Sequence, residues 1–555
     1  MVQKNIASLW GWLWQLHGET KRFLTFSQLR NVEDSQNPKK RIEKNIPSSG
    51  NGNKSGHHKK PAYKPAQKVG LILGPLLFLL TLLFFHPEGL SPEARSVLAV
   101  TLWVATWWIT EPIPIPVSSL IPIILLPTTG ALDGSTVVSS YGNDIIFLFL
   151  GGFFIATAME KWNLHKRMAL SIISVIGTSP QRIVLGFMVA TAFLSMWVSN
   201  TAATMMLIPM GLAIVHQASS SLEKGKYASD IPKFEKSVIF GIGYAATVGG
   251  LGTLIGTPPL SILAATVGTM FDTEISFAGW MMIGVPMVVI LIPLLWLFLT
   301  KVVYKINFRE LPGGKEQINK ERNSLGKITY EEKAVAVVFV FAAFMWITRT
   351  FIWQNIVEIP GISDGIIAMI ATVLLFLIPA KREEGSKIME WKDSKDIPWG
   401  ILILFGGGLA IAAGFTSTGL SEWIGLQLAG LEGMNILLVM FISTLVILLL
   451  TEITSNTATG TMIIPVVASL ALALNIHPYA LMVPCAMAAN CSFMLPVGTP
   501  PNAIMYGTGR LKITEMVKNG FWLNNFTLVL IILVVYFYLP IVWGIDLFEI
   551  PTEFR

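Results

Sequence analysis

Long apolar runs separated by short polar segments follow one another from about residue 69 to residue 545. A helix needs about 20 mostly apolar residues to cross about 30 Å of hydrocarbon, and the runs are of that order. The pattern therefore predicts an all-α polytopic membrane protein. The apolar runs are 69–86, 96–110, 113–128, 144–160, 183–214, 237–268, 276–304, 333–353, 364–380, 399–419, 435–472, 478–506 and 521–545.

Two of these runs, 183–214 and 435–472, are interrupted midway by a Ser-Asn-Thr triplet. The triplets are Ser199–Thr201 and Ser455–Thr457. The arms on either side of the first triplet would be about 24 and 20 Å long as helices, so each is too short to cross the bilayer comfortably. We therefore predict two re-entrant hairpins whose polar tips end near the middle of the membrane.

The positions of Lys and Arg between the runs indicate which loops face the cytoplasm. With eleven spans and two non-crossing hairpins, five loops with at least three Lys or Arg each lie on the side of the N-terminus, and three loops without Lys or Arg lie on the other side. The basic loops are 161–182, 215–236, 305–333, 381–396 and 508–519, and the others are 129–143, 420–434 and 473–477. The distribution predicts a multi-pass plasma-membrane protein with a cytoplasmic N-terminus and an extracellular C-terminus.

The composition also favours a membrane protein, because 53% of the residues are hydrophobic and only 13% are charged, against about 25% charged in an average soluble protein. The net charge of +6 is unevenly distributed. Residues 1–68 carry 13 Lys or Arg and 4 Asp or Glu, a balance of +9, whereas the remainder carries 27 and 30. We predict that 1–68 is a disordered basic tail on the cytoplasmic side, facing anionic lipid headgroups rather than nucleic acid.

The sequence has no pattern typical of a catalytic or metal centre, which argues against an enzyme. Cys485 and Cys491 lie in one apolar run without metal-ligand spacing, and the seven His residues fall in the tail or near the ends of runs. No phosphate-binding loop or nucleophile–base pair is present. Glu452, beside the second triplet, is open to two interpretations, a proton relay or a structural partner of the hairpin, whereas Glu111 at a span end is expected to be architectural.

Several motifs occur twice, which predicts an internal repeat. The recurring motifs are Ser199-Asn200-Thr201-Ala202 with Ser455-Asn456-Thr457-Ala458, Gly151-Gly152 with Gly407-Gly408, and Gly256-Thr257-Pro258-Pro259 with Gly498-Thr499-Pro500-Pro501. Because five spans lie between the hairpins, the two halves enter the bilayer in opposite orientations. Inverted repeats with interrupted helices are typical of secondary transporters.

The repeated motifs have the chemistry of an ion site. Backbone in hydrocarbon must be hydrogen-bonded internally unless it lines a polar cavity, and each Gly-Thr-Pro-Pro is expected to unwind a span and free carbonyl groups for a cation. Hydroxyl and amide oxygens suit a hard cation such as Na⁺, and the helix N-terminus after each break offers N–H groups to an anion. No Lys or Arg occurs in the tips or breaks, so sodium ions would supply the charge that holds an anionic substrate.

At these paired motifs the sequence resembles the divalent anion/sodium symporter (DASS) family. The likeness runs from about Val69 to Asp546, and its strongest stretches are Leu71–Phe85, Tyr141–Gly152, Gly249–Leu260, Pro398–Leu409 and Glu452–Asn502. The resemblance implies a homodimer of elevator-type transporters, each with a scaffold and a moving transport domain. The implied parts are the tail 1–68, scaffold 69–182 and 333–420, transport domain 183–306 and 435–545, and a cytoplasmic loop 307–332.

The resemblance also assigns roles to individual residues. It places one sodium site at Ser195, Ser199, Asn200 and Gly256, and a second at Thr451, Thr454, Asn456 and Gly498. It places the substrate carboxylates at Asn200, Thr201, Thr257, Asn456, Thr457, Thr499 and Pro500. The halves differ at one position, where Leu260 follows the first Pro pair and Asn502 follows the second, which puts a polar role at Leu260 in doubt.

The expected function is sodium-coupled uptake of C4-dicarboxylates such as succinate, fumarate and malate. Two alternatives within the family stay open, a sodium-independent dicarboxylate exchanger and a carrier of citrate or sulfate. A membrane enzyme or quinone-binding subunit is disfavoured by the missing catalytic clusters, and a channel is the least favoured reading. The expected partners are the dicarboxylate, co-transported Na⁺ and the lipid bilayer.

Overall fold

The computed structural model describes residues 63–177, 179–222, 228–308, 314–382, 385–428, 433–551 and 554. Regular structure in these residues is helical, apart from one isolated bridge between Pro379 and Lys387. This confirms the predicted all-α class. The tail predicted to be disordered lies almost entirely outside the described residues. The first described helix, α4, begins at Pro65.

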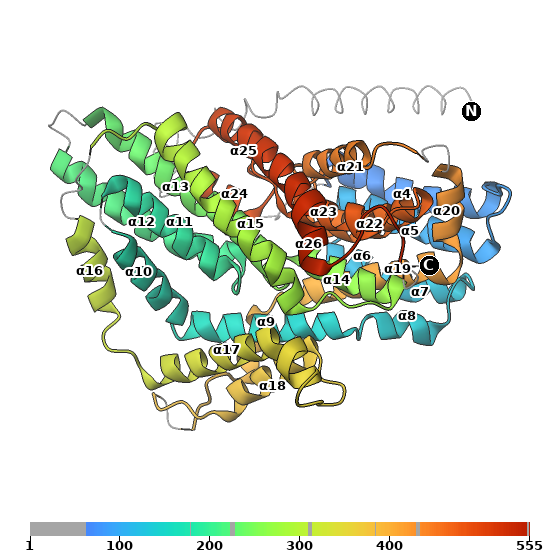
Figure 1. The fold of residues 1–555 in the computed structure, drawn as a ribbon, viewed down its shortest axis with the longest axis horizontal. Helices are drawn as coiled ribbons and strands as arrows, with labels where there is room; N and C mark the ends of the chain where they lie inside the picture. Colours follow the sequence, from blue (N-terminus) through green and yellow to red (C-terminus); the bar gives the residue numbers. More distant parts are fainter. Residues whose placement is uncertain are drawn as a thin grey trace, which may run out of the picture.

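The helices follow one another closely along the chain (Figure 1). Their bounds are α4 Pro65–Phe84, α5 Pro92–Thr110, α6 Ile115–Ser118, α7 Ile121–Thr128, α8 Gly134–Ser140, α9 Asp144–Lys161, α10 Leu164–Ile176, α11 Pro180–Ser195, α12 Asn200–Leu222, α13 Ile231–Gly249, α14 Pro258–Phe271, α15 Phe277–Leu297, α16 Gly314–Ser324, α17 Tyr330–Thr348, α18 Asp364–Leu377, α19 Trp399–Ser417, α20 Leu420–Leu428, α21 Ile436–Leu450, α22 Asn456–Ala473, α23 Tyr479–Asn490, α24 Pro500–Gly507, α25 Ile513–Leu533 and α26 Leu539–Trp543.

Seven helical segments of the described chain are long and apolar enough to cross a membrane. The longest, Ile513–Trp543, joins α25 and α26 through one wide helical turn. Six shorter apolar segments accompany them, among them α11, α14, α21 and α23. Helices of this kind bury their backbone hydrogen bonds within one segment, as a lipid environment requires.

Both interrupted runs break where the sequence predicts. Helix α11 ends at Ser195 and α12 begins at Asn200, while α21 ends at Leu450 and α22 begins at Asn456. One arm is longer than expected, because α12 continues for 23 residues, about 34 Å. Four further helices, α8, α10, α16 and α20, lie in segments expected to be loops. Helix α10 forms there because one of its faces is apolar and buried.

The two halves of the chain meet in the interior. Helix α14 of the first half packs against α22 and α23 of the second, and α24 of the second half packs against α12 and α13 of the first. These are the helices that flank the tips and breaks. Packing between the repeats therefore brings motifs separated by more than 200 residues into one region.

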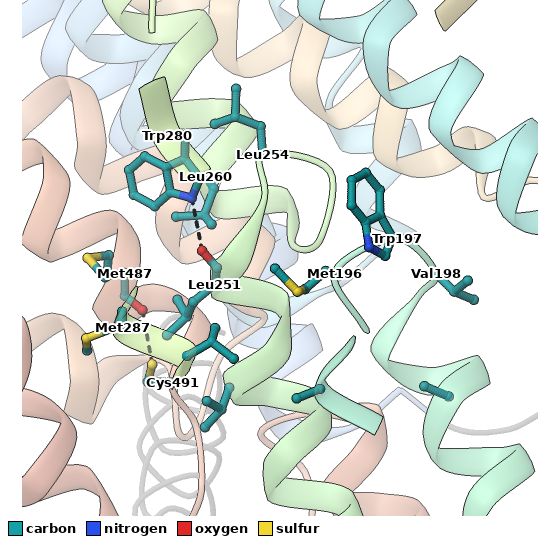
Figure 2. Close-up of a cluster of buried hydrophobic side chains, with 14 of the residues drawn as sticks. Met196, Trp197, Val198, Leu251, Leu254, Leu260, Trp280, Met287, Met487 and Cys491 are labelled. Carbon is teal, nitrogen blue, oxygen red and sulfur yellow. Dashed lines mark hydrogen bonds between the residues drawn. The ribbon is translucent and has the colours of Figure 1, made fainter. Parts of the chain in front are cut away.

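Apolar side chains pack behind the first break, on the side that does not line the cavity described below (Figure 2). Leu251, Leu254 and Leu260 are fully buried there, together with Trp280 of α15. The Trp280 indole N–H donates to the main-chain oxygen of Leu251 at 3.0 Å, which satisfies a carbonyl group that the break removes from the helical ladder. The unwound backbone is thus fixed by packing and by a hydrogen bond.

Candidate functional site

Both hairpin tips and both Gly-Thr-Pro-Pro breaks line one cavity of about 1560 Å³. Most of the residues predicted for the site line it: Ser199, Asn200, Thr201, Gly256, Thr257, Thr454, Asn456, Thr457, Gly498, Thr499 and Pro500. The two remaining predicted residues, Ser195 and Thr451, are fully buried and do not line it. The structure therefore brings the two repeated sets together around a shared space.

The two breaks have the same backbone conformation. Thr257 caps α14 with φ −152° and ψ 139°, and Thr499 caps α24 with φ −141° and ψ 153°. Each is extended because the residue before proline avoids the helical region. Two prolines then begin each helix, where a missing N–H group costs nothing. The repeated sequence thus produces a repeated geometry.

Four helices begin at the tips and breaks that line this cavity. Asn200 starts α12, Pro258 starts α14, Asn456 starts α22 and Pro500 starts α24, and all four residues line the cavity. The N-terminus of a helix carries a partial positive charge and N–H groups without helical partners. Four such ends around one space favour an anion without any basic side chain.

The first set of predicted cation ligands contains oxygens that are available for coordination. Ser195 Oγ and Asn200 Oδ1 are buried and have no hydrogen-bond partner among the described residues. The main-chain oxygen of Gly256 lies close by, since a Cβ placed on Gly250 would be 3.1 Å from both this oxygen and Asn200 Oδ1. Buried oxygens without donors suit a hard cation.

The second set is more strongly hydrogen-bonded within the protein. Thr451 Oγ1 lies 2.6 Å from Asn456 Oδ1 and 2.7 Å from the main-chain oxygen of Ala489. Thr454 Oγ1 lies 2.6 Å from Thr459 Oγ1. A cation could use these oxygens only if the hydroxyl hydrogens turn away. The two sets are therefore alike in sequence but different in hydrogen bonding.

The charges around the cavity lie away from the tips. Lys64 and Lys68 are the basic residues among the described residues that line it, and Glu111, Glu160 and Asp396 are acidic. All five belong to segments at or near the predicted cytoplasmic side, whereas the tips and breaks contribute hydroxyl, amide and main-chain groups. An anion at the tips would therefore meet dipoles and cations, not a basic side chain.

Glu452 has a structural role, the second of the two interpretations left open for it. Its carboxylate is 2% exposed and accepts hydrogen bonds from the N–H groups of Phe493, Met494 and Leu495, from Ser492 Oγ and from Asn524 Nδ2. These donors occupy both carboxylate oxygens, so the side chain is held firmly in place. The carboxylate ties the second tip to the second break.

Asn502, which corresponds to Leu260 of the first half, also has a structural role. Its Nδ2 donates to the main-chain oxygens of Ser492 and Leu495 at 3.1 and 3.0 Å, which satisfies carbonyl groups of the second break. Leu260 instead lies in the apolar cluster behind the first break (Figure 2). In this structure, therefore, Leu260 has an apolar packing role.

Two residues near these motifs were not predicted from the sequence. Gly250 faces the first cation set at close range, and the close match of Gly249–Leu260 with the resembled family was its available signal. Asn490 lies between two half-sites, which are the tip and break of the first half and the tip and break of the second. It hydrogen-bonds with Thr257 and Asn456. The repeat gives no signal for Asn490, because the corresponding residue of the first half is Val248.

Comparison with known proteins agrees with this architecture. A relative from Staphylococcus saprophyticus, named sodium-dependent dicarboxylate transporter SdcS, is 56% identical over 486 residues, which cover 87% of this chain and 94% of the relative. A protein of the same name from Staphylococcus aureus is 54% identical over 490 residues, covering 88% and 94%. The solved structure of the Alcanivorax borkumensis YdaH transporter shares the fold, with a TM-score of 0.53 at 14% identity over 73% of this chain and 89% of that one.

The resemblance drawn from the motifs is confirmed at the level of the family. The family described as the sodium:sulfate symporter transmembrane region matches residues 66–545. This range contains both hairpin tips, both breaks and the four helices that begin at them. The chain belongs to this family and is a multi-pass membrane protein.

Proposed function

We propose that this protein is a secondary active transporter that carries C4-dicarboxylates, such as succinate, fumarate and malate, into the cell together with sodium ions. The observation that carries the proposal is the single cavity lined by two Ser-Asn-Thr tips and two Gly-Thr-Pro-Pro breaks. The names of relatives that are 54% and 56% identical support the choice of sodium and dicarboxylate.

The coupling follows from charge. A dicarboxylate carries two negative charges, and the tips and breaks hold no Lys or Arg. Helix N-termini offer partial charges of about +0.5 each, and sodium ions bound beside them supply the remaining positive charge. Each ligand then raises the affinity of the other, because their interaction free energy is reciprocal.

The residue assignments form part of the proposal. One sodium ion is held by Ser195, Ser199, Asn200 and the Gly256 carbonyl group, and the other by Thr451, Thr454, Asn456 and the Gly498 carbonyl group. The substrate carboxylates contact Asn200, Thr201, Thr257, Asn456, Thr457, Thr499 and Pro500. The buried oxygens of Ser195 and Asn200, which have no hydrogen-bond partner in the described part of the chain, support the first set.

The proposed mechanism is an elevator with eleven spans and two hairpins in each protomer of a homodimer. The transport domain comprises 183–306 and 435–545, and the scaffold comprises 69–182 and 333–420. The cavity extends from the tips to Lys64, Glu160 and Asp396, which the proposed topology places at the cytoplasmic side. In this arrangement, the structure corresponds to the state that releases its cargo into the cell.

Succinate uptake into proteoliposomes, with external Na⁺ replaced by K⁺ or choline, tests the proposal. We expect uptake with Na⁺ and only background uptake without it, and undiminished uptake would contradict symport. Vesicles preloaded with succinate distinguish the exchanger, whose uptake requires internal substrate. Excess unlabelled citrate or sulfate in the same assay shows whether either anion competes better than fumarate and malate.

A further inference from the structure

Asn490 connects the two half-sites through its side chain and its main chain. It is the last residue of α23, is 1% exposed and lines the cavity. Its Oδ1 accepts a hydrogen bond from Thr257 Oγ1 at 2.6 Å, and its Nδ2 donates to the main-chain oxygen of Thr247 at 2.7 Å. Its main-chain oxygen accepts from Asn456 Nδ2 at 3.1 Å. The side chain thus contacts the first half, and the main chain contacts the second.

These contacts fix the direction of two proposed substrate-binding groups. A threonine hydroxyl can donate one hydrogen bond, and Thr257 donates it to Asn490 Oδ1. The side-chain amide of Asn456 has two hydrogens, and one of them is directed at the main-chain oxygen of Asn490. A carboxylate that accepts a hydrogen bond from the Thr257 hydroxyl must therefore replace Asn490 as the acceptor. The loss of this contact alters the end of α23 and with it the contact to Asn456.

We propose that Asn490 is a positioning residue that couples the two half-sites, so that the binding of a carboxylate at Thr257 is transmitted to Asn456. The inference rests on the proposed function, because it takes Thr257 and Asn456 to bind the substrate. Val248 stands at the corresponding position of the first half and has no polar side-chain group. The coupling residue therefore belongs to one half alone.

A double-mutant cycle tests whether Asn490 acts through Thr257. Succinate uptake by proteoliposomes is measured for Asn490→Ala, Thr257→Val and the double variant. We expect each single change to raise the KM for succinate about 10-fold, and the double variant to match Thr257→Val within about twofold. Multiplication of the two effects, to about 100-fold, would overturn the inference. Failure of the proposed function is a separate result, visible as wild-type protein without sodium-dependent uptake.

Asn519→Ala is the matched control. Asn519 is also buried and also donates from its side chain, to the Tyr304 hydroxyl at 3.1 Å, away from the cavity. It reports the general cost of deleting a buried amide. We expect its KM to stay within about twofold of the wild type, and a KM as high as that of Asn490→Ala would overturn the inference.

Asn490→Asp provides a pH signature that a merely structural role would not produce. The ionised carboxylate still accepts from Thr257, but it cannot donate to the Thr247 carbonyl group. The protonated acid has one acceptor and one donor, as asparagine has. We expect the ratio of variant to wild-type uptake to rise at least threefold from pH 7.5 to 5.5 for Asn490→Asp, and to stay constant for Asn519→Asp. A constant ratio for Asn490→Asp, or an equal rise in both variants, would contradict the inference.

Discussion

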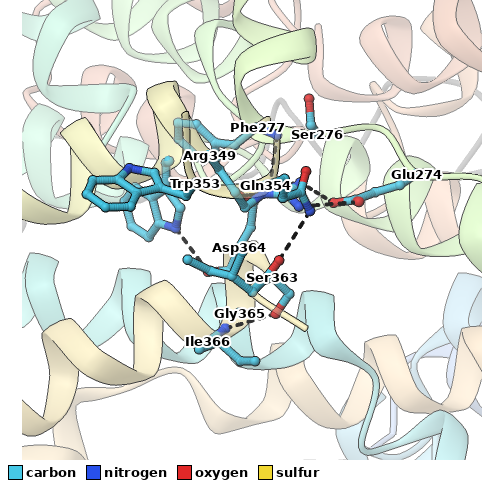
Figure 3. A network of polar contacts seen from close by, with 12 residues as sticks. Glu274, Ser276, Phe277, Arg349, Trp353, Gln354, Ser363, Asp364, Gly365 and Ile366 are labelled. Atoms are coloured by element: carbon cyan, nitrogen blue, oxygen red, sulfur yellow. Dashed lines mark hydrogen bonds and ion pairs between the residues drawn. The ribbon is translucent and has the colours of Figure 1, made fainter. Parts of the chain in front are cut away.

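The guanidinium group of Arg349 and the carboxylate of Asp364 form an ion pair that is closed to solvent (Figure 3). Arg349 Nε donates to Asp364 Oδ1 at 2.6 Å, and the two side chains are 1% and 2% exposed. The other oxygen of Asp364 accepts from the N–H group of Phe277 at 2.9 Å. The ion pair therefore joins the end of α17 to the start of α18, and Asp364 in turn holds the start of α15. Glu274 adds a second carboxylate to the guanidinium group.

Arg349→Met should destabilise the protein strongly. The substitution leaves the Asp364 carboxylate buried without its cation, and breaking a buried pair in this way costs about 3 to 5 kcal/mol. The expected result is a clear fall in the unfolding temperature of the detergent-solubilised protein. Adding Asp364→Asn should recover part of the loss, because the remaining buried group is then neutral.

Arg510→Met is the matched control for that experiment. Arg510 contacts Glu235 at 3.3 Å, but its side chain is 61% exposed, and exposed pairs contribute about 0 to 1 kcal/mol. Its unfolding temperature should remain close to that of the wild type. Equal losses for Arg349→Met and Arg510→Met would show that burial does not determine the strength of the Arg349 pair.

Gly250→Ala should impair sodium binding at the first site. The new Cβ would lie 3.1 Å from Asn200 Oδ1 and from the Gly256 carbonyl oxygen, which are two proposed ligands. We expect the Na⁺ concentration for half-maximal uptake to rise about 10-fold or more. Gly507→Ala is the control, because a Cβ there meets no atom within 4 Å. An unchanged sodium dependence in Gly250→Ala would show that the space beside Gly250 is not part of the first sodium site.

Asn200→Ala and Asn456→Ala should each abolish sodium-dependent uptake while the protein still folds. Each substitution deletes an amide that is proposed to contact both a sodium ion and a carboxylate. Uptake in proteoliposomes should fall to background, and size-exclusion profiles should match the wild type. Either variant with normal uptake would show that its asparagine is not part of the site.

The stability of the folded protein should fall on acidification because of His477. Burial lowers the pKa of this imidazole to about 4, whereas an unfolded histidine titrates near pH 6.5. The folded state is thus favoured fully above pH 6.5, and this contribution is lost as the pH falls from about 6.5 to 4. His477→Gln should reduce the fall in unfolding temperature between pH 7.5 and 5, and an unchanged fall would contradict the assignment.

The hydrophobic pattern predicted the interrupted helices correctly because a Ser-Asn-Thr triplet cannot continue an apolar run without a partner. The interruptions begin slightly before the triplets, since α11 ends at Ser195 and α21 at Leu450. They end within the triplets, because Asn200 and Asn456 already start the following helices. The pattern did not predict α8, α10, α16 and α20. Short helices whose faces differ in polarity give a weak signal in a test that looks for uniformly apolar spans.

The repeat predicted only those parts of the site that occur twice, and the family resemblance supplied the others, such as Thr454. Both motif sets occur twice, so their approach in space followed from the inverted arrangement. Asn490 and Glu452 have no polar counterpart in the first half, where Val248 and Met196 occupy the corresponding positions. Their hydrogen bonds depend on how α23, the second break and α25 pack, which no local pattern determines.

The central claim is that sodium and the dicarboxylate bind to one cavity and depend on each other. Equilibrium binding of succinate to the purified protein, measured by calorimetry with NaCl and then with choline chloride at equal ionic strength, tests it most directly. We predict saturable binding in sodium, with an apparent Kd that falls as the sodium concentration rises, and no measurable binding in choline. The same Kd in both salts would contradict the account.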